Sequence, residues 1–137
     1  MNKIEHIGIA VKDIASSDEL FRKLFGRAAY KMESVKSEGV KTSFFKLGPN
    51  KIELLEATSP DSPIAKFIEK KGEGIHHIAF DVDDIEAEIA RLKDEGFELI
   101  NDTPKDGADN KLIAFLHPKS TNGVLIELCQ EKPPEAR

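Results

Sequence analysis

Residues 4–14, IEHIGIAVKDI, and residues 75–85, IHHIAFDVDDI, align without a gap at an offset of 71 positions, and six of the eleven residues are identical. Both stretches alternate in the period of two that is typical of a strand, and each has a histidine in third place, His6 and His77. An amphipathic stretch and further short strand patterns follow each copy. Because a small open unit cannot bury a sheet face alone, we predict an α+β fold of two repeated βαβββ modules that form a cupped mixed sheet.

The helix signals repeat as well. Ser16 and Glu19 have the spacing of a capping box, and Asp83 and Glu86 repeat it in the second copy. Gly26 is expected to end the first helix. In the second copy we expect strands at 97–101 (FELIN), 111–117 (KLIAFLH) and 123–130 (GVLIELCQ).

These patterns predict one domain over residues 1–137. Its expected parts are module one at about 1–58, a linker helix at about 62–71, module two at about 74–131 and a loose polar tail at 132–137.

Composition excludes several classes of protein. A net charge of −5 with interspersed signs gives no basic field for nucleic acid, and no apolar run approaches the length of a membrane helix. The first residues, MNKIEHIG, lack a secretory apolar region, and the single cysteine, Cys129, allows no internal disulfide. We therefore expect a cytoplasmic protein with no nucleic-acid or membrane partner.

Strand parity indicates four ionisable residues as candidates for a functional site. His6 shares its strand face with small residues, as does His77, and Glu53 and Glu127 occupy matching places in the last strand of each module. A lone histidine or glutamate in a strand is usually structural or solvent-facing. A buried carboxylate, however, is costly unless it is paired or metal-bound, and these four come as two repeat-related pairs. Two imidazoles and two carboxylates predict a site for a divalent ion such as Co, Ni, Zn or Mn.

His117 and Lys119 have two readings each. His117, in FLHPKSTNG, is either an exposed loop residue or a contact to substrate, and Lys119 is either a solvated charge or a partner for an anion. The parity of His76 places it with the opposite, apolar face of its strand, so we expect a packing role rather than a ligand.

Three stretches carry a resemblance to a known family. HIGIAVKDI, IELLEATSPDSPIAKFIEKKGEGIHHIAFDVDDI and FLHPKSTNGVLIEL resemble the methylmalonyl-CoA epimerases of the vicinal oxygen chelate (glyoxalase/bleomycin resistance/dioxygenase) superfamily. The likeness covers nearly the whole chain and implies a glyoxalase-like fold, a homodimer, a role in propionate metabolism and a divalent metal, with Co expected. The family's ligand positions fall on His6, Glu53, His77 and Glu127.

The resemblance also implies a reaction. It is the epimerisation of (R)- and (S)-methylmalonyl-CoA, an acyl-CoA thioester, by removal and return of the C2 proton through a metal-stabilised enolate. Glu127 is the first candidate for the base, and Glu53 is its partner on the other side. Certain bacterial members carry a proposed catalytic glutamate on the third strand where this chain has Thr42, which leaves the second base open.

Two alternatives remain at this stage. A glyoxalase I type isomerase uses a similar metal site but acts on a hemithioacetal of glutathione. A metal-free binding module of the same fold would hold a small molecule without catalysis, although it has no use for four ligands.

Overall fold

The computed structural model describes residues 1–133, and the chain forms two compact units. The first unit is His6–His76, and the second unit combines Met1–Glu5 with the chain from His77 onward. Of the tail expected at 132–137, residues 134–137 lie outside the described part.

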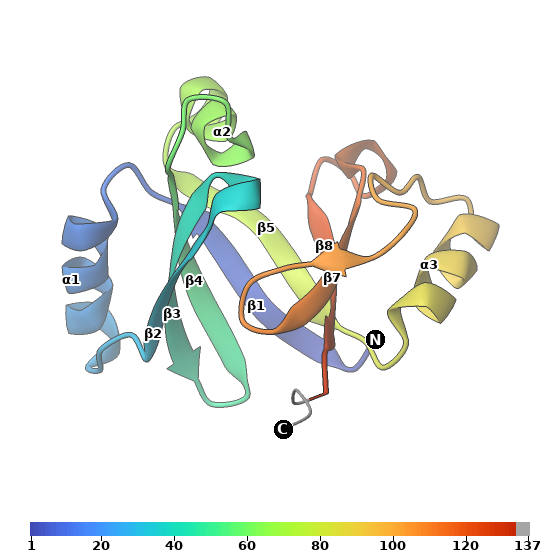
Figure 1. The fold of residues 1–137 in the computed structure, drawn as a ribbon, viewed down its shortest axis with the longest axis horizontal. Coiled ribbons are helices and arrows are strands. Elements are labelled where there is room, and N and C mark those ends of the chain that lie inside the picture. The colour runs from blue at the N-terminus through green and yellow to red at the C-terminus, as the bar shows by residue number, and fades with distance from the viewer. Residues whose placement is uncertain (134–137) are drawn as a thin grey trace. The chain divides into compact units, whose positions relative to one another are not determined.

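The first unit contains a four-stranded mixed sheet in the order β2-β3-β4-β1 (Figure 1). β1 and β4 are parallel, whereas β3 is antiparallel to both of its neighbours. The elements are β1 (Lys3–Ala10, whose first three residues belong to the second unit), α1 (Ile14–Phe25), β2 (Lys31–Val35), η1 (Lys36–Glu38), β3 (Val40–Leu47), β4 (Asn50–Ala57) and α2 (Pro63–Lys71).

The second unit repeats this arrangement with the order β5-β8-β7-β6. β5 and β8 are parallel, and β7 is antiparallel to β8 and β6. The elements are β5 (Gly74–Asp81, whose first three residues belong to the first unit), α3 (Ile85–Asp94), β6 (Lys105–Asp106), β7 (Lys111–Leu116), η2 (Pro118–Ser120) and β8 (Ile126–Glu131). The predicted fold class, an α+β fold of two βαβββ modules, is confirmed.

The strand expected at 97–101 is wrong. Within this stretch, only Leu99 makes an isolated bridge, to Leu116. The strand that follows α3 in the chain is instead the two-residue β6, at Lys105–Asp106. The backbone instead runs beside the end of β7, where Ile100 donates to the carbonyl of Phe115 at 2.8 Å.

The helix starts also differ from the expected capping boxes. Asp13 caps α1 by accepting from the backbone N–H of Ser16 at 3.2 Å, and Asp84 caps α3 by accepting from Ala87 at 3.1 Å. α1 is therefore capped three residues before the predicted Ser16, and α3 is capped one residue after the predicted Asp83. The two aspartates, Asp13 and Asp84, occupy the same place in the repeat. An aspartate satisfies the orphan N–H groups of a first turn directly, so no capping box is needed. Gly26 ends α1 as expected, in the left-handed conformation.

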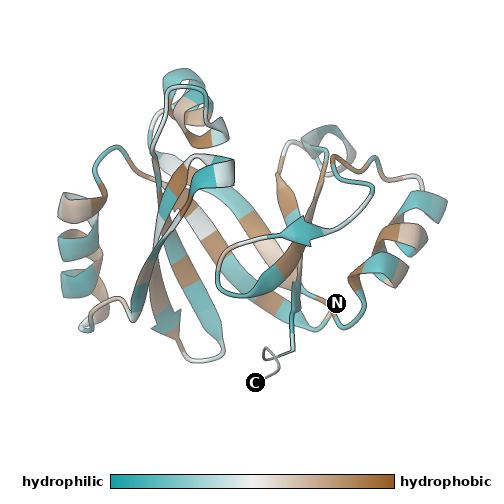
Figure 2. Ribbon diagram, viewed as in Figure 1, coloured by the Kyte–Doolittle hydropathy of each residue, from teal (hydrophilic) through white to brown (hydrophobic). Residues whose placement is uncertain are grey.

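Each unit packs one helix, α1 or α3, against one face of its sheet, and in the first unit α2 packs against Ala10 and Leu55 on the other face. In the first unit α1 covers an apolar cluster that includes Phe45 and Leu54, and in the second unit α3 covers a cluster that includes Ile85, Leu116 and Leu128. Alternate residues on the strands therefore face away from these helices, which Figure 2 shows as brown and teal bands along the strands. The predicted ligands lie among the residues of that other face.

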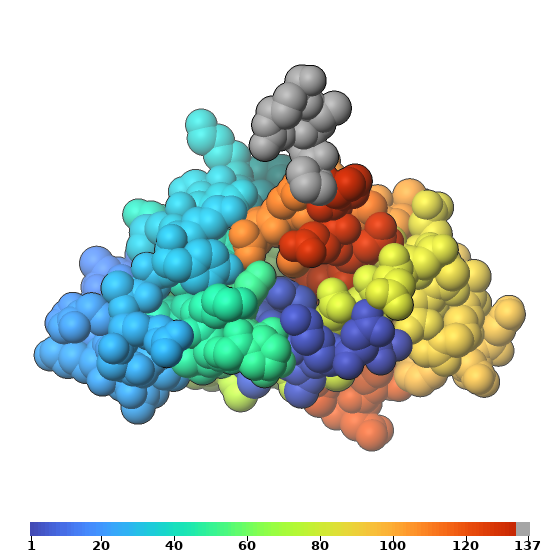
Figure 3. All heavy atoms as spheres, turned by 90° about the horizontal axis from the view of Figure 1, so that it is seen from below, coloured from blue at the N-terminus to red at the C-terminus, as the bar shows by residue number. Residues whose placement is uncertain are grey.

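The first residues of the chain are held by the start of α3. The side chain of Asn2 donates to Asp81 and Asp83 at 3.0 Å each, and the terminal amine of Met1 lies 3.4 Å from Glu88. Figure 3 shows these first residues, in blue, beside the yellow segment that contains α3. Within the described residues, no helix has the length and apolar character needed to cross a membrane.

Candidate metal-binding and catalytic residues

The first unit holds a buried histidine–glutamate pair. β1 carries His6, and the neighbouring β4 carries Glu53 opposite Gly8, which shares the strand face of His6. The Nδ1 atom of His6 lies 3.2 Å from Oε2 of Glu53, and the side chains are 5% and 8% exposed.

The second unit builds the same pair from its equivalent strands. β5 carries His77, and β8 carries Glu127 opposite Ala79, two residues along the same face. The Nε2 atom of His77 lies 2.9 Å from Oε1 of Glu127, and the side chains are 6% and 7% exposed. The structure thus places each histidine beside the glutamate of the same module.

The spacing within each pair suits metal binding. Metal bonds to imidazole nitrogen and carboxylate oxygen are both about 2.1 Å long, so two such ligands at right angles lie about 3 Å apart. The observed separations of 3.2 and 2.9 Å are compatible with this value, and they equally match a hydrogen bond between imidazole and carboxylate. Each pair therefore presents one nitrogen and one oxygen donor, a set that fits a divalent transition ion.

Each pair also has an aromatic neighbour that the sequence analysis missed. Phe44 lies directly across from Glu53 on β3, and Phe115 lies directly across from Glu127 on β7. The ring of Phe115 meets that of His77 edge-on, with centroids 5.9 Å apart. The signal was present in the sequence, because the two phenylalanines are separated by the same 71 positions as the two histidines.

His117 and Lys119 occupy the turn after β7. The Nδ1 atom of His117 accepts a hydrogen bond from the backbone N–H of Lys119 at 3.1 Å. Lys119 pairs with Glu98 at 2.8 Å, and this hydrogen bond holds the pKa of Glu98 below its usual value. The predicted contact of both residues with substrate stays a prediction.

His76 and Cys129 take packing roles. The His76 ring meets Phe67 of α2 edge-on at 5.0 Å, and Cys129 is fully buried in a cluster with Ala79 and Ile113.

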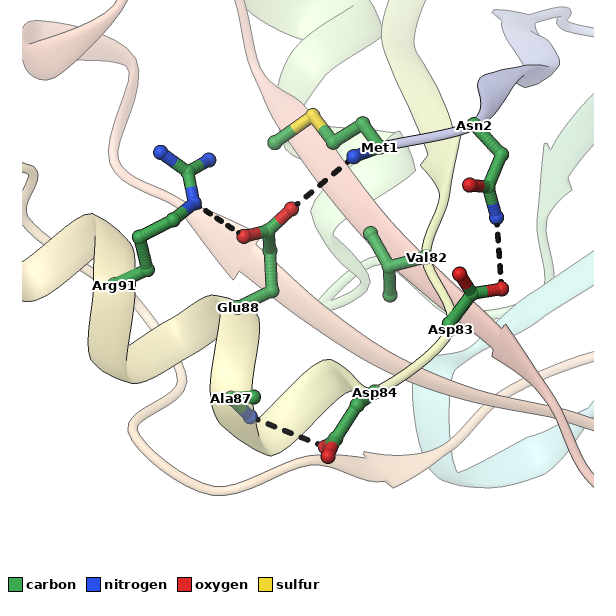
Figure 4. A pocket seen from close by; sticks show the side chains of 8 residues that line it. All are labelled: Met1, Asn2, Val82, Asp83, Asp84, Ala87, Glu88 and Arg91. Carbon is green, nitrogen blue, oxygen red and sulfur yellow. Dashed lines mark hydrogen bonds and ion pairs between the residues drawn. The ribbon is translucent and has the colours of Figure 1, made fainter.

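A pocket in the second unit lies at the start of α3 (Figure 4). Its side chains are largely engaged with one another, since Glu88 bonds both Arg91, at 2.5 Å, and the terminal amine. Its lining residues are Met1, Asn2, Val82, Asp83, Asp84, Ala87, Glu88 and Arg91, and none of them is a predicted site residue.

Comparison with known proteins identifies the family. Residues 5–115 match the model of the glyoxalase/bleomycin resistance protein/dioxygenase superfamily. The chain belongs to this superfamily. The expected glyoxalase-like fold is thereby confirmed.

Similar proteins narrow the family further. The mitochondrial methylmalonyl-CoA epimerase of Dictyostelium discoideum is 41% identical, over 93% of this chain and 78% of its own. A variant of the Streptomyces coelicolor methylmalonyl-CoA epimerase, solved in complex with 2-nitronate-propionyl-CoA, has a TM-score of 0.93 at 36% identity and covers 100% of this chain and 99% of its own. A hypothetical protein, BH1468 of Bacillus halodurans, has a TM-score of 0.94 at 47% identity and covers 99% of both chains. Within the superfamily, the chain thus belongs with the methylmalonyl-CoA epimerases, which are isomerases, as the resemblance implied.

Proposed function

We propose that this protein is a metal-dependent epimerase that interconverts (R)- and (S)-methylmalonyl-CoA. The observation that carries the proposal is the buried histidine–glutamate pair, which occurs once in each unit at repeat-related positions. Epimerases of the same family match this chain over almost its whole length.

His6, Glu53, His77 and Glu127 are the proposed ligands of a single divalent ion. Support for joining the two pairs comes from the repeat and from family membership, and support for a metal comes from the buried set of imidazole and carboxylate donors. Imidazole and carboxylate donors suit Co, Ni, Zn and Mn, and we propose Co as the bound ion. When bound, such an ion supplies Lewis-acid stabilisation of the negative charge that develops on the substrate oxygens.

The chain itself supplies the groups that move the proton. The C2 proton lies between a thioester carbonyl and a carboxylate, so its removal leaves an enolate, and its return to the other face completes the epimerisation. Glu127 is the proposed base on one face, through the carboxylate oxygen that does not pair with His77. A second carboxylate must serve the other face, and Glu53 is the candidate that the repeat nominates.

Burial of both pairs favours this chemistry. Side chains that are less than a tenth exposed hold their orientation through packing and strand pairing, and they exclude water from the enolate. Phe44 and Phe115 contribute apolar walls beside the two glutamates. His117 and Lys119 remain the proposed contacts to the substrate outside the reacting centre.

The test follows deuterium into C2. The protein is incubated as purified, after EDTA treatment and after Co addition, with methylmalonyl-CoA in D2O, and exchange is followed by NMR against a protein-free sample. We expect exchange that is lost on stripping and restored by Co. Methylglyoxal with glutathione serves as the second substrate: consumption of the hemithioacetal without C2 exchange would instead establish a glyoxalase I activity, and silence on both would leave a binding module.

A pair of variants tests the role of Glu127. Glu127→Gln should lower inversion at least 100-fold, since general base catalysis contributes about 10²–10⁴ in rate. Glu131→Gln is the matched control, because Glu131 lies on the same strand face but is 77% exposed. Normal inversion by Glu127→Gln with metal still bound would exclude Glu127 as a base.

The remaining expectations have their own measurements. The homodimer is proposed from the resemblance and is tested by sedimentation of the purified protein. The cytoplasmic location and the role in propionate metabolism stay predictions.

A further inference from the structure

We infer that Glu56 and Gln130 are positioning residues of the proposed metal ligands. Each accepts a hydrogen bond from the first residue of a helix, and so ties the strand that carries a ligand glutamate to the strand that carries the histidine beside it. This inference rests on the epimerase function proposed above. It adds one residue in each unit that acts on the ligands through the strands.

In the first unit the contact joins β4 to the start of α1. The Oε1 atom of Glu56 accepts the backbone N–H of Ile14, the first residue of α1, at 3.2 Å. The carbonyl of the neighbouring Leu55 accepts the N–H of Val11 at 2.9 Å. Val11 begins, and Ile14 follows, the short corner in which β1 turns into α1. β4 is therefore bonded to both ends of this corner.

The second unit has the same two contacts at the equivalent place. The Oε1 atom of Gln130 accepts the backbone N–H of Ile85, the first residue of α3, at 2.8 Å. The carbonyl of Cys129 accepts the N–H of Val82 at 2.9 Å. β8 is therefore bonded to both ends of the corner between β5 and α3.

The repeat keeps these contacts in step with the histidine–glutamate pairs. Each acceptor lies three residues after a ligand glutamate, and each helix donor lies eight residues after a ligand histidine. The two acceptors differ in charge, since one is a carboxylate and the other a carboxamide, but both side chains have the same length and end in an oxygen. The feature common to both units is thus the oxygen acceptor and not the charge.

The acceptors lie on the sheet face opposite to the ligands. Successive side chains of a strand point to opposite faces, so Glu56 shares the α1 face with Leu54, whereas Glu53 lies on the other face. In the same way Gln130 shares the α3 face with Leu128. A substitution at either acceptor therefore leaves the side chains of the ligand face unaltered and can affect them only through the strands.

The bond to the helix start fixes the register on which each pair depends. A shift of two residues between parallel strands keeps every side chain on its face, but it moves a glutamate about 6.6 Å along the strand, away from its histidine. The separations of 3.2 and 2.9 Å within the two pairs require one register. A side-chain bond to a helix start forms in that register alone. Its loss leaves the first N–H of the helix without this acceptor, and the corner must then move to satisfy the N–H elsewhere.

The test removes or exchanges the acceptor oxygens. Glu56→Met and Gln130→Met keep the length of the side chain and remove the oxygen. Glu56→Gln and Gln130→Glu give each unit the acceptor of the other. Asp13→Ala is the matched control, because Asp13 also accepts an N–H of the first turn of α1, but from Ser16 and within the helix start itself.

Each protein is titrated with Co, and three quantities are measured: the Kd for Co, the visible absorption spectrum at saturating Co, and the Tm. Deuterium exchange at C2 of methylmalonyl-CoA is followed at saturating Co. The spectrum reports the arrangement of the ligands around Co, which a loss of folding stability alone does not change.

We expect Glu56→Met and Gln130→Met to bind Co at least 10-fold more weakly than the wild type and to shift the spectrum at saturation, since residues that orient metal ligands contribute about 10–100-fold to affinity. Glu56→Gln and Gln130→Glu should keep the affinity and the spectrum of the wild type. Asp13→Ala should lower the Tm through loss of the cap, yet bind Co with unchanged affinity and spectrum.

Two results would overturn the inference. One is wild-type affinity and spectrum in both methionine variants, and the other is an equal loss of affinity in Asp13→Ala, which would assign the effect to the stability of the helix start. If Glu56→Met does not fold, Glu56→Asp makes the same comparison, because it withdraws the oxygen by one methylene and should weaken Co binding in part. Failure of the proposed function has a different signature, since the Co-loaded wild type would then bring no deuterium into C2.

Discussion

Gly39 and Gly48 form a matched pair for testing how the first unit is packed. Both have a left-handed backbone, with φ of +63° and +60°. A Cβ at Gly39 would lie 2.8 Å from the Cβ of Ser62, the residue that caps α2, whereas a Cβ at Gly48 would meet nothing within 4 Å. Alanine therefore imposes the same backbone strain at both positions but a steric clash at only one.

The expected magnitudes follow from these two effects. A left-handed alanine costs about 1 kcal/mol, so Gly48→Ala should lower the free energy of unfolding by that amount. Gly39→Ala adds an overpacking cost of about 1–3 kcal/mol, because both contacting atoms belong to well-anchored backbone segments. For a chain of this size each kcal/mol corresponds to about 4 °C in Tm.

Urea and thermal unfolding of both variants measure the difference. We expect Gly39→Ala to unfold about 4–12 °C below Gly48→Ala. Ser62→Gly removes the opposing Cβ, so it should cost less in the Gly39→Ala background than alone. Equal Tm values for the two alanine variants would refute the packing of the η1 turn against the start of α2.

Three further predictions concern the core, the acid response and the metal. Phe44→Ala should cost about 3–5 kcal/mol in urea unfolding, because its ring is completely buried; a cost below 1 kcal/mol would contradict that packing. The hydrogen bond from Arg91 holds the pKa of Glu88 below its usual 4.5, so this pair stabilises the fold at neutral pH and stops doing so as the pH falls through the lowered pKa. The urea midpoint should therefore fall less between pH 7 and pH 3 in Glu88→Gln than in the wild type. An equal fall in both proteins would exclude this contribution of Glu88. Co at 100 times its wild-type Kd should raise the free energy of unfolding of the wild type by about 2.7 kcal/mol. If His77→Ala binds Co 100-fold more weakly, the same Co concentration should raise the free energy of unfolding of this variant by only about 0.4 kcal/mol. An equal gain for both proteins in calorimetry would show that His77 is not a ligand.

The repeat made most of the fold predictable. Strand alternation and an ungapped offset of 71 positions identified β1, β5 and the histidines they carry, because both signals are local in the sequence. Helix starts were less predictable, since Ser16 and Asp13 are both good caps and only the final turn geometry decides between them. The misplaced strand at 97–101 has a similar cause: its apolar residues pack under α3, where Phe97 and Leu99 join the core without pairing in a ladder.

The site was predictable only as far as single strands allow. Parity and the repeat nominated the four residues one by one, and the structure added that His6 lies beside Glu53 and His77 beside Glu127. Parity within one strand says nothing of which residue of the next strand lies opposite, so the register of Gly8 with Glu53 required the structure. The charged surroundings of Lys119 were hidden for the same reason, because Glu98 lies 21 positions away in the chain.

The two hairpins that hold Phe44 opposite Glu53 and Phe115 opposite Glu127 differ in length. Nine positions separate the first two residues and twelve separate the second two, yet both remain cross-strand partners. Relative to the first hairpin, the second therefore has an insertion of three residues. The insertion lies in the β7–β8 connection, where the ladder ends at Leu116 and Ile126 and the loop with His117 and Lys119 begins. Because the extra length lies beyond the last ladder pair, both hairpins keep a phenylalanine opposite their glutamate although their loops differ in length.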